Sequence, residues 1–204
     1  MIDFSNCEVN NFKYYGGKNG GKICIIYENE DYMLKFPSIN EKLEDHEYTN
    51  NCISEYIACN IIKTLDLNVQ ETILGTFNKN EIQKIVVACK DFTSNGTVLK
   101  QFAELKNSQI ETSRNGYGTE LNEVIETIEN QLIYDVNELK DFFWDMFIAD
   151  CLVGNFDRHN GNWGFLSDVN GNFEIAPIFD CGSCLFPAAD DNLIKQQLND
   201  YSEL

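Results

Sequence analysis

Residues 154–182 read GNFDRHNGNWGFLSDVNGNFEIAPIFDCG, and this segment says more about the architecture than any other. Two parts of it, Trp163–Leu166 and Phe173–Phe179, are typical of β-strands. Between them stands Asn170-Gly171, the strongest short-range signal for a two-residue type I′ turn. The segment therefore predicts a β-hairpin that begins directly after a polar loop.

Asn162 and Asp180 flank the predicted hairpin. In the register of a two-residue turn, Asn162 lies opposite Phe179, and Asp180 lies diagonally beside Asn162. Mg²⁺ prefers one or two oxygen ligands from protein and takes the others from water and phosphate. We therefore expect Asn162 and Asp180 to bind a metal ion at the open end of the hairpin.

Asp157 lies on the loop between the hairpin and a predicted helix, Asp135–Val153. An aspartate on such a loop can accept or orient the proton of an incoming hydroxyl group while metal ions screen phosphate charge. We expect Asp157 to be the catalytic base. His159, close by, is expected to hold the loop by hydrogen bonding rather than to take part in catalysis.

The composition is that of an ordinary globular protein. The 204 residues include 43% hydrophobic and 12% aromatic residues, enough for the core of one domain or two small lobes. The formal charge of -18 and the pI near 4.3 argue against non-specific nucleic-acid binding, which needs clustered Lys and Arg. The same negative charge disfavours anionic membrane surfaces.

The N-terminal sequence MIDFSNCEVNNFKYY has no basic segment followed by an apolar stretch, so we expect no secretory signal. The eight cysteines lie mostly in apolar runs, which is typical of buried, reduced thiols in a cytosolic protein. Cys181 and Cys184 form a CxxC pair, but the sequence offers no second pair of ligands for zinc.

The first half of the chain alternates between strand-like and helix-like patterns. A glycine-rich turn precedes a predicted hairpin, and then come a helix and two strands: Ile23–Tyr27, Tyr32–Phe36, Asn51–Leu65, Thr72–Asn78 and Ile82–Cys89.

The second half is predicted to be mainly helical. Residues 93–118 are polar and indicate a loop with at most a short helix near Val98–Leu105. Periodic apolar residues predict helices over Glu120–Leu132 and Asp135–Val153, the second with an Asp135–Glu138 capping box. Gly154 is suited to the left-handed conformation that ends a helix.

The segment 157–162, DRHNGN, followed by Asp180-Cys181-Gly182 resembles the catalytic and metal-binding loops of the HipA-like serine/threonine kinases, whose first motif is D-x-H-x-x-N. Phosphoinositide kinases carry a similar D-R-H-x-x-N motif, so this segment alone leaves protein and lipid substrates open.

The resemblance implies matching parts in the first half of the chain. Lys35 in YMLKFP would contact the ATP phosphates, and Glu55 would pair with it from the next helix, with Glu44 and Glu47 as alternatives. A glycine-rich loop would cover the phosphates, and its candidates are Gly16, Gly17, Gly20 and Gly21.

A hinge is also implied, over Val86–Phe92. The main chain of three residues there would pair with adenine: Ala88, Cys89 and Lys90. The resemblance also brings in a form of regulation, because some HipA-type kinases switch themselves off by phosphorylating a serine in the glycine loop; Tyr14–Lys22 contains no Ser or Thr, so we do not expect that regulation here.

The expected architecture is an α+β, two-lobed protein-kinase-like fold. Residues 1–91 would form a small antiparallel N-terminal lobe with one helix, and residues 92–204 a helical lobe that is truncated after Asp180. ATP would lie between the lobes. The chain resembles the compact members of the family, which lack an extra N-terminal subdomain.

The resemblance implies an ATP- and Mg²⁺-dependent serine/threonine protein kinase of the bacterial cytoplasm, acting as the toxin of a toxin–antitoxin pair or as an effector on host cells. The implied partners are ATP, a protein substrate, and an antitoxin or a completing chain. A signal-independent route of secretion stays open. Two alternatives are a nucleotide-binding module without turnover, which needs a partner or a further segment, and a lipid kinase.

Overall fold

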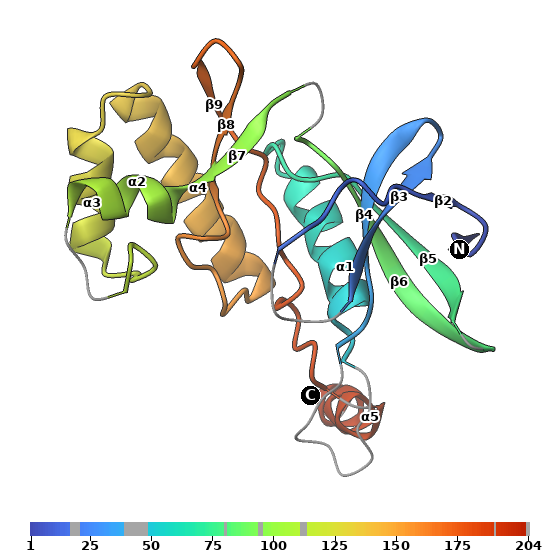
Figure 1. The fold of residues 1–204 in the computed structure, drawn as a ribbon. Coiled ribbons are helices and arrows are strands. Elements are labelled where there is room, and N and C mark those ends of the chain that lie inside the picture. The colour runs from blue at the N-terminus through green and yellow to red at the C-terminus, as the bar shows by residue number, and fades with distance from the viewer. Residues whose placement is uncertain are drawn as a thin grey trace.

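The computed structural model describes residues 1–16, 21–38, 49–79, 81–93, 96–110, 114–189 and 191–202. Figure 1 shows an α+β fold in which a curled sheet and a mainly helical part stand on either side of helix α1. The strands are β1 (Ile2–Asp3), β2 (Glu8–Val9), β3 (Lys22–Tyr27), β4 (Glu30–Lys35), β5 (Thr72–Lys79), β6 (Ile82–Lys90), β7 (Val98–Gln101), β8 (Gly164–Ser167) and β9 (Phe173–Ile175). The helices are α1 (Asn51–Lys63), α2 (Phe102–Gln109), α3 (Leu121–Asn130), α4 (Val136–Val153) and α5 (Asp191–Ser202).

The N-terminal sheet has the strand order β1-β5-β6-β4-β3-β2. Its pairs are antiparallel, as expected, except that the short strand β1 runs parallel to β5. β3 and β4 form a hairpin whose turn residues Glu28 and Asn29 have φ values of 50° and 65°. Two positive φ values in a two-residue loop are the signature of a type I′ turn, which matches the right-handed twist of the strands.

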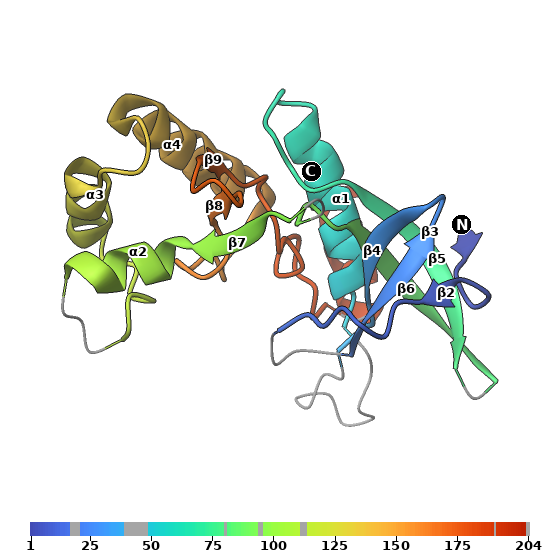
Figure 2. The ribbon, with the colours of Figure 1, turned by 45° about the horizontal axis from the view of Figure 1, so that its top comes forward.

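Helix α1 lies between the sheet and the helical part (Figure 2). Its apolar residues recur at helical spacing, and Ala58, Cys59 and Ile62 belong to the core of the helical part. Cys52, two helical turns before Cys59, packs with Val87 and Cys89 of β6. The helix therefore couples the two parts of the fold.

The core of the helical part is built around Trp163. Its ring stacks on Phe102 at a centroid distance of 3.9 Å, and its Nε1–H donates to Asn160 Oδ1 at 3.3 Å. The three-stranded ribbon β7-β8-β9 and the helices α2, α3 and α4 surround this core. Trp163 thus fixes the segment between the catalytic-loop candidates and β8.

The two ends predicted for α4 are confirmed, with Asp135 as the N-terminal cap and Gly154 as the C-terminal cap; of the predicted capping box, the structure shows the Asp135 half. Asp135 Oδ1 accepts hydrogen bonds from the main-chain N–H groups of Asn137 and Glu138 at 2.9 and 3.0 Å. Gly154 ends the helix with φ 64° and ψ 41°, the left-handed conformation that glycine adopts without steric strain.

The register predicted for the second hairpin is wrong by one residue. Phe165 faces Ile175, and Asp168 N–H donates to Asn172 O at 3.1 Å. The loop between Asp168 and Asn172 therefore has three residues, one more than a type I′ turn allows. Asp168 Oδ1 accepts the N–H groups of Asn170 and Asn172, each at 2.8 Å, and Gly171 has φ 82°. These features define a three-residue loop with a glycine bulge.

The predicted strand Phe173–Phe179 is also too long. It ends at Ile175, because Pro177 cannot donate to a ladder, and Ile178 instead forms a parallel bridge with Val69. Asn162 and Phe179 therefore do not face each other across the ribbon.

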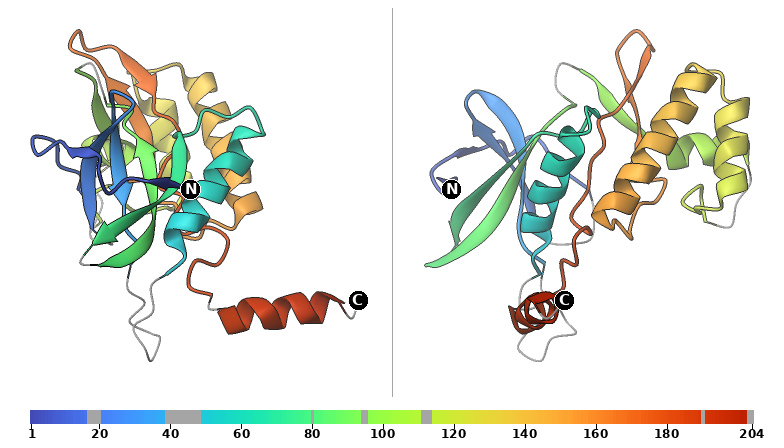
Figure 3. Two further views of the ribbon diagram at one scale, coloured as in Figure 1. Left: turned by 90° about the vertical axis from the view of Figure 1, so that its right-hand side faces the viewer. Right: turned by 180° about the vertical axis from the view of Figure 1, so that it is seen from behind.

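Four of the described elements were not predicted from the sequence: β1, β2, β7 and α5. Val98–Gln101 is a strand that pairs with β8 and is followed at once by α2, where a loop with at most a short helix was predicted. Helix α5 stands apart from the ribbon and from α2 to α4, as Figure 3 shows. In the described ranges, no helix has the length and apolarity needed to cross a bilayer.

Candidate active site

Lys35, at the end of β4, lies between two carboxylates. Its Nζ is 2.6 Å from Glu55 Oε1, 2.8 Å from Glu55 Oε2 and 3.0 Å from Asp180 Oδ1. The ion pair predicted between Lys35 and Glu55 is therefore confirmed; the alternative partners at 44 and 47 lie outside the described residues. Strand β4, helix α1 and the chain after β9 meet at this one ammonium group.

The charges in this cluster are buried to different degrees. Only 6% of Lys35 and 1% of Glu55 are exposed, whereas the side chain of Asp180 is 43% exposed. Burial alone would lower the pKa of Lys35, but the two carboxylates raise it well above its ordinary value. Lys35 is therefore a fixed positive charge, and the open side of Asp180 is available to a ligand.

Asp180 is held as a carboxylate in an unusual backbone conformation. Burial would raise its pKa, but the ammonium group of Lys35 holds the pKa below its ordinary value. Its φ is 59°, the left-handed region that aspartate visits more readily than most side chains do. Asp180 comes two residues after Ile178, whose main chain is held by a parallel bridge to Val69. The direction of the carboxylate is therefore set by the backbone as well as by its ion pair.

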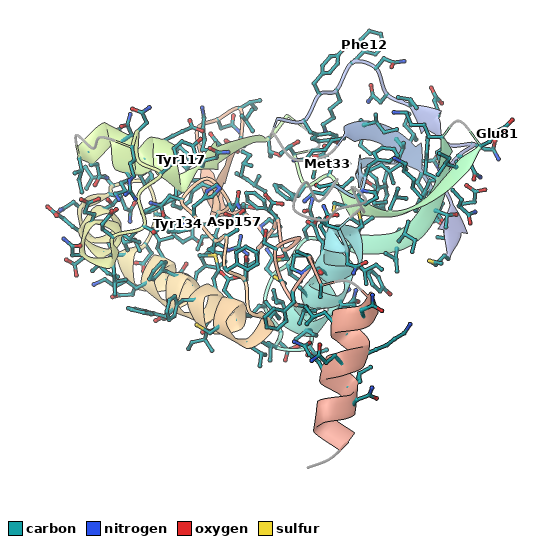
Figure 4. The ribbon with its side chains drawn as sticks, turned by 90° about the horizontal axis from the view of Figure 1, so that it is seen from below. Phe12, Met33, Glu81, Tyr117, Tyr134 and Asp157 are labelled. Atoms are coloured by element: carbon teal, nitrogen blue, oxygen red, sulfur yellow. The ribbon has the colours of Figure 1, made fainter. Side chains whose placement is uncertain are left out.

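Asp157 and Asn162 belong to one compact loop after α4. Asn162 Nδ2 donates to the main-chain oxygen of Asp157 at 3.4 Å, and Asn155 Oδ1 accepts the Asp157 N–H at 3.3 Å. The amide nitrogen of Asn162 is thus used inside the loop, which leaves its Oδ1 as the group that can bind a cation. The side chain of Asp157 is exposed, and Figure 4 labels this residue together with Tyr117 and Tyr134 of the helical part.

His159 has the structural role expected of it. Its Nδ1 accepts the N–H of Gly161 at 3.0 Å, and its ring meets the edge of Tyr117 at a centroid distance of 5.8 Å. The Asn162 N–H donates to the main-chain oxygen of His159 at 2.8 Å, so the histidine closes the turn that presents Asn162.

Arg158 is a member of the site that sequence reasoning missed. It pairs with Asp150 of α4, with Nε 2.8 Å from Oδ2 and Nη2 3.1 Å from Oδ1. Its Nη1 donates to the main-chain oxygens of Asn162 and Phe179, both at 2.6 Å. One sequence does not reveal these contacts. The available signal was the presence of an arginine inside the motif at residues 157–162.

The glycine-rich loop is described only in part, because Gly17 and Gly20 lie outside the described residues. A Cβ atom at Gly16 would meet no atom within 4 Å, and one at Gly21 would lie 3.7 Å from the Phe36 ring. Steric contact with the described residues therefore does not explain glycine at these two positions.

Ala88, Cys89 and Lys90 do not offer the free main-chain groups that were expected to pair with adenine. β6 lies between β5 and β4, so the sheet uses the main chain of Ala88 and Cys89. The Lys90 N–H donates to Glu71 O at 2.8 Å. The first segment past the sheet is Asp91–Thr93, where the Asp91 N–H donates to Asp31 O at 2.9 Å.

A second cluster missed from the sequence joins this linker to the chain before the glycine loop. Asp91 accepts a hydrogen bond from Tyr15 Oη at 2.5 Å, pairs with Lys13 Nζ at 2.6 Å and accepts the Thr93 N–H at 2.6 Å. Burial would raise the pKa of Asp91, but Lys13 and these hydrogen bonds hold it below its ordinary value. The N-terminal segment is thereby anchored to the linker.

All eight cysteines are free thiols, and Cys181 and Cys184 are fully buried. In the parts of the chain that the structure describes, no three His, Cys, Asp or Glu side chains gather closely enough to hold a metal by themselves. The oxygen atoms of Asn162 and Asp180 are the donors suited to a hard cation that also binds phosphate.

Comparisons with known proteins identify the family of the chain. The model of the HipA-like C-terminal domain family matches residues 20–202. The chain is 54% identical over its 204 residues to the serine/threonine-protein kinase CtkA of Helicobacter pylori, and it spans 62% of that relative's length.

Solved structures match as well. The crystal structure of a Helicobacter pylori proinflammatory kinase CtkA has a TM-score of 0.90 and 53% identity, covering 100% of this chain and 68% of that chain. HipA in the Shewanella oneidensis MR-1 complex of HipA, HipB and operator DNA has a TM-score of 0.50 and 16% identity, covering 85% and 46%. The second match concerns the fold alone.

These matches confirm the two-lobed, kinase-like α+β fold expected from the sequence. The family model covers most of the chain, from the end of the glycine loop to α5. The chain therefore belongs to the family of HipA-like C-terminal domains.

Proposed function

We propose that this chain binds magnesium-ATP and transfers the γ-phosphoryl group to serine or threonine hydroxyl groups of a protein. The observation that carries the proposal is the contact of Lys35 Nζ with both Glu55 and the half-exposed carboxylate of Asp180. The ammonium group of Lys35 is fixed by the buried carboxylate of Glu55 and lies next to the open carboxylate of Asp180. In this arrangement phosphate can bind at the ammonium group and a metal ion at the open carboxylate, side by side. The name of the CtkA relative supports the same activity.

The donor atoms left open on the chain fit the cofactor. Lys35 would contact phosphate oxygens as a point charge, while Glu55 holds it in position. Asn162 Oδ1 and the free oxygen of Asp180 would hold Mg²⁺. When bound, magnesium-ATP supplies the phosphoryl group and neutralises charge on it. The four glycines of the loop at positions 16, 17, 20 and 21 would cover the phosphates, because glycine has no side chain to hinder close approach.

Asp157 is the proposed base. Its carboxylate is exposed, whereas its main chain is fixed from both sides by Asn155 and Asn162. The side chain can therefore reach a hydroxyl group from a docked protein, orient it and accept its proton at a carboxylate oxygen.

The two proposed lobes are residues 1–91 and 92–204, joined at Asp91–Thr93. The ring of Phe92 in this linker lies 5.5 Å from that of Phe179, just before Asp180. We infer that adenine contacts this linker rather than Ala88 to Lys90, whose main chain the sheet uses.

Protein rather than lipid is the substrate we propose, because the chain carries a formal charge of -18, which disfavours approach to anionic phosphoinositide membranes. Free cysteines fit a reducing compartment such as the bacterial cytoplasm. A partner that completes or regulates the helical part, in the manner of an antitoxin, belongs to the same proposal.

The test is transfer of labelled γ-phosphate from ATP to protein substrates, with phosphoinositide vesicles assayed in parallel. We expect Mg²⁺-dependent labelling of serine or threonine that is lost in Lys35→Met and Asp157→Asn. Lys140→Met, which removes a surface ion pair between α4 and α3, is the matched control. Nucleotide binding with no transfer to any protein would favour the module without turnover.

A further inference from the structure

Arg158 contacts two separate segments that carry the proposed metal ligands. Its Nη1 donates to the main-chain oxygen of Asn162 and to that of Phe179, the residue before Asp180. We propose that Arg158 is a positioning residue: its guanidinium group sets the placement of Asn162 relative to Asp180 and thereby the affinity of the site for its divalent cation. This inference rests on the proposed function.

The guanidinium group is itself firmly anchored. Asp150, in the last turn of α4, is 6% exposed and pairs with Nε and Nη2 of Arg158 through both carboxylate oxygens. Asp150 Oδ1 also accepts Asn155 Nδ2 at 2.8 Å, and Asn155 holds the main chain of Asp157. The end of α4 therefore anchors both the loop at residues 157–162 and the segment that leads into Asp180.

The hydrogen bond to Phe179 bears directly on Asp180. The Phe179 oxygen belongs to the peptide unit that leads into Asp180, whose φ is 59°. A non-glycine residue in that conformation needs its neighbouring peptide unit to be held in place. A charge-assisted bond at 2.6 Å provides this restraint, and so fixes the direction of the carboxylate.

Arginine suits this position better than lysine. Besides the contacts to Asp150, Asn162 and Phe179, Nη2 lies 3.7 Å from Cys181 Sγ, so each of the five N–H donors has a partner. A lysine keeps the charge and can pair with Asp150, but its ammonium group cannot donate in the planar fork that joins the two main-chain oxygens.

The experiment compares wild type, Arg158→Lys, Asp180→Asn and the control Lys140→Met. Calorimetry measures the affinity for a non-hydrolysable ATP analogue over a range of Mg²⁺ concentrations, including none. We expect Arg158→Lys to need about tenfold more Mg²⁺ for the same gain in affinity for the ATP analogue. Loss of a residue that holds the metal ligands in place usually weakens metal binding by about 10- to 100-fold. Metal-free affinity should stay unchanged, and high Mg²⁺ should rescue Arg158→Lys but not Asp180→Asn.

A second measurement does not depend on ligand. Hydrogen exchange of the free protein should become faster in Arg158→Lys at residues 157–162 and 178–182 together, while exchange in β3 and β4 stays as in wild type. Asp150→Asn, which weakens the anchor, should show the same pattern.

Three results would overturn the inference. In the first, Arg158→Lys keeps the wild-type Mg²⁺ response. In the second, its ATP affinities with and without metal both fall, in parallel with its free energy of unfolding, and this would indicate a merely structural arginine. In both cases the wild-type response leaves the proposed function standing. A wild-type protein without any Mg²⁺-dependent gain would instead overturn the proposed function and this inference with it.

Discussion

Lys35 Nζ lies 3.0 Å from Asp180 Oδ1, although 145 residues separate them in the sequence. Strand β4 carries Lys35, the segment after β9 carries Asp180, and Glu55 of helix α1 pairs with the same ammonium group. The cluster therefore joins three segments that are distant in the sequence.

Removal of the ammonium group should destabilise the fold as well as abolish transfer. Lys35→Met leaves Glu55, 1% exposed, as a buried charge without its partner, which typically costs about 3–5 kcal/mol. Urea unfolding measures the loss. Lys35→Met combined with Glu55→Leu should recover much of the stability without recovering transfer; a double variant as unstable as the single one would contradict this account of the pair.

Acid should weaken the contribution of Asp180 to stability. Its pKa in the folded protein lies below the ordinary value of 3.8, so its stabilisation is complete above that pH and is lost as the pH falls through the folded pKa. The stability difference between wild type and Asp180→Asn should thus be constant near neutrality and shrink below pH 3.8. A difference that grows in acid would refute the lowered pKa.

Asp157→Asn should separate chemistry from binding. The side chain is exposed, so neither folding nor ATP affinity should change, whereas loss of a general base typically lowers the turnover rate by about 10²- to 10⁴-fold. Steady-state kinetics beside an ATP binding curve makes the comparison. A parallel fall in ATP affinity would mean that Asp157 helps to hold the nucleotide.

The turn of the second hairpin offers a test of backbone conformation alone. Gly171 has φ 82°, and a Cβ atom there would meet no atom within 4 Å. Gly171→Ala should therefore destabilise the protein by about 1–2 kcal/mol through its left-handed conformation only. Gly171→Asn should lose less, because asparagine tolerates that region, and equal stability of all three proteins would argue against the observed turn.

Local signals in the sequence were enough to predict the parts of the fold that local interactions fix. The ends of α4 follow from the side chain of Asp135 and the left-handed Gly154. The pairing of Lys35 with Glu55 came from the family resemblance, which left Glu44 and Glu47 as alternatives, and the structure shows the pair with Glu55.

Interactions between distant residues decided the remainder. The hairpin register depends on Asp168, whose carboxylate accepts two N–H groups and adds a residue to the loop. Strand β7 forms only because β8, far along the chain, pairs with it. Arg158 meets its partners 8 and 21 residues away, at spacings that no helix or strand period marks.

The most direct measurement of the central claim is calorimetric titration of ATP into wild type and Asp180→Asn, with and without Mg²⁺. The account predicts that Mg²⁺ raises the ATP affinity of wild type and has no such effect on Asp180→Asn, while the metal-free affinities of the two proteins are similar. Equal gains from Mg²⁺ in both proteins would contradict it.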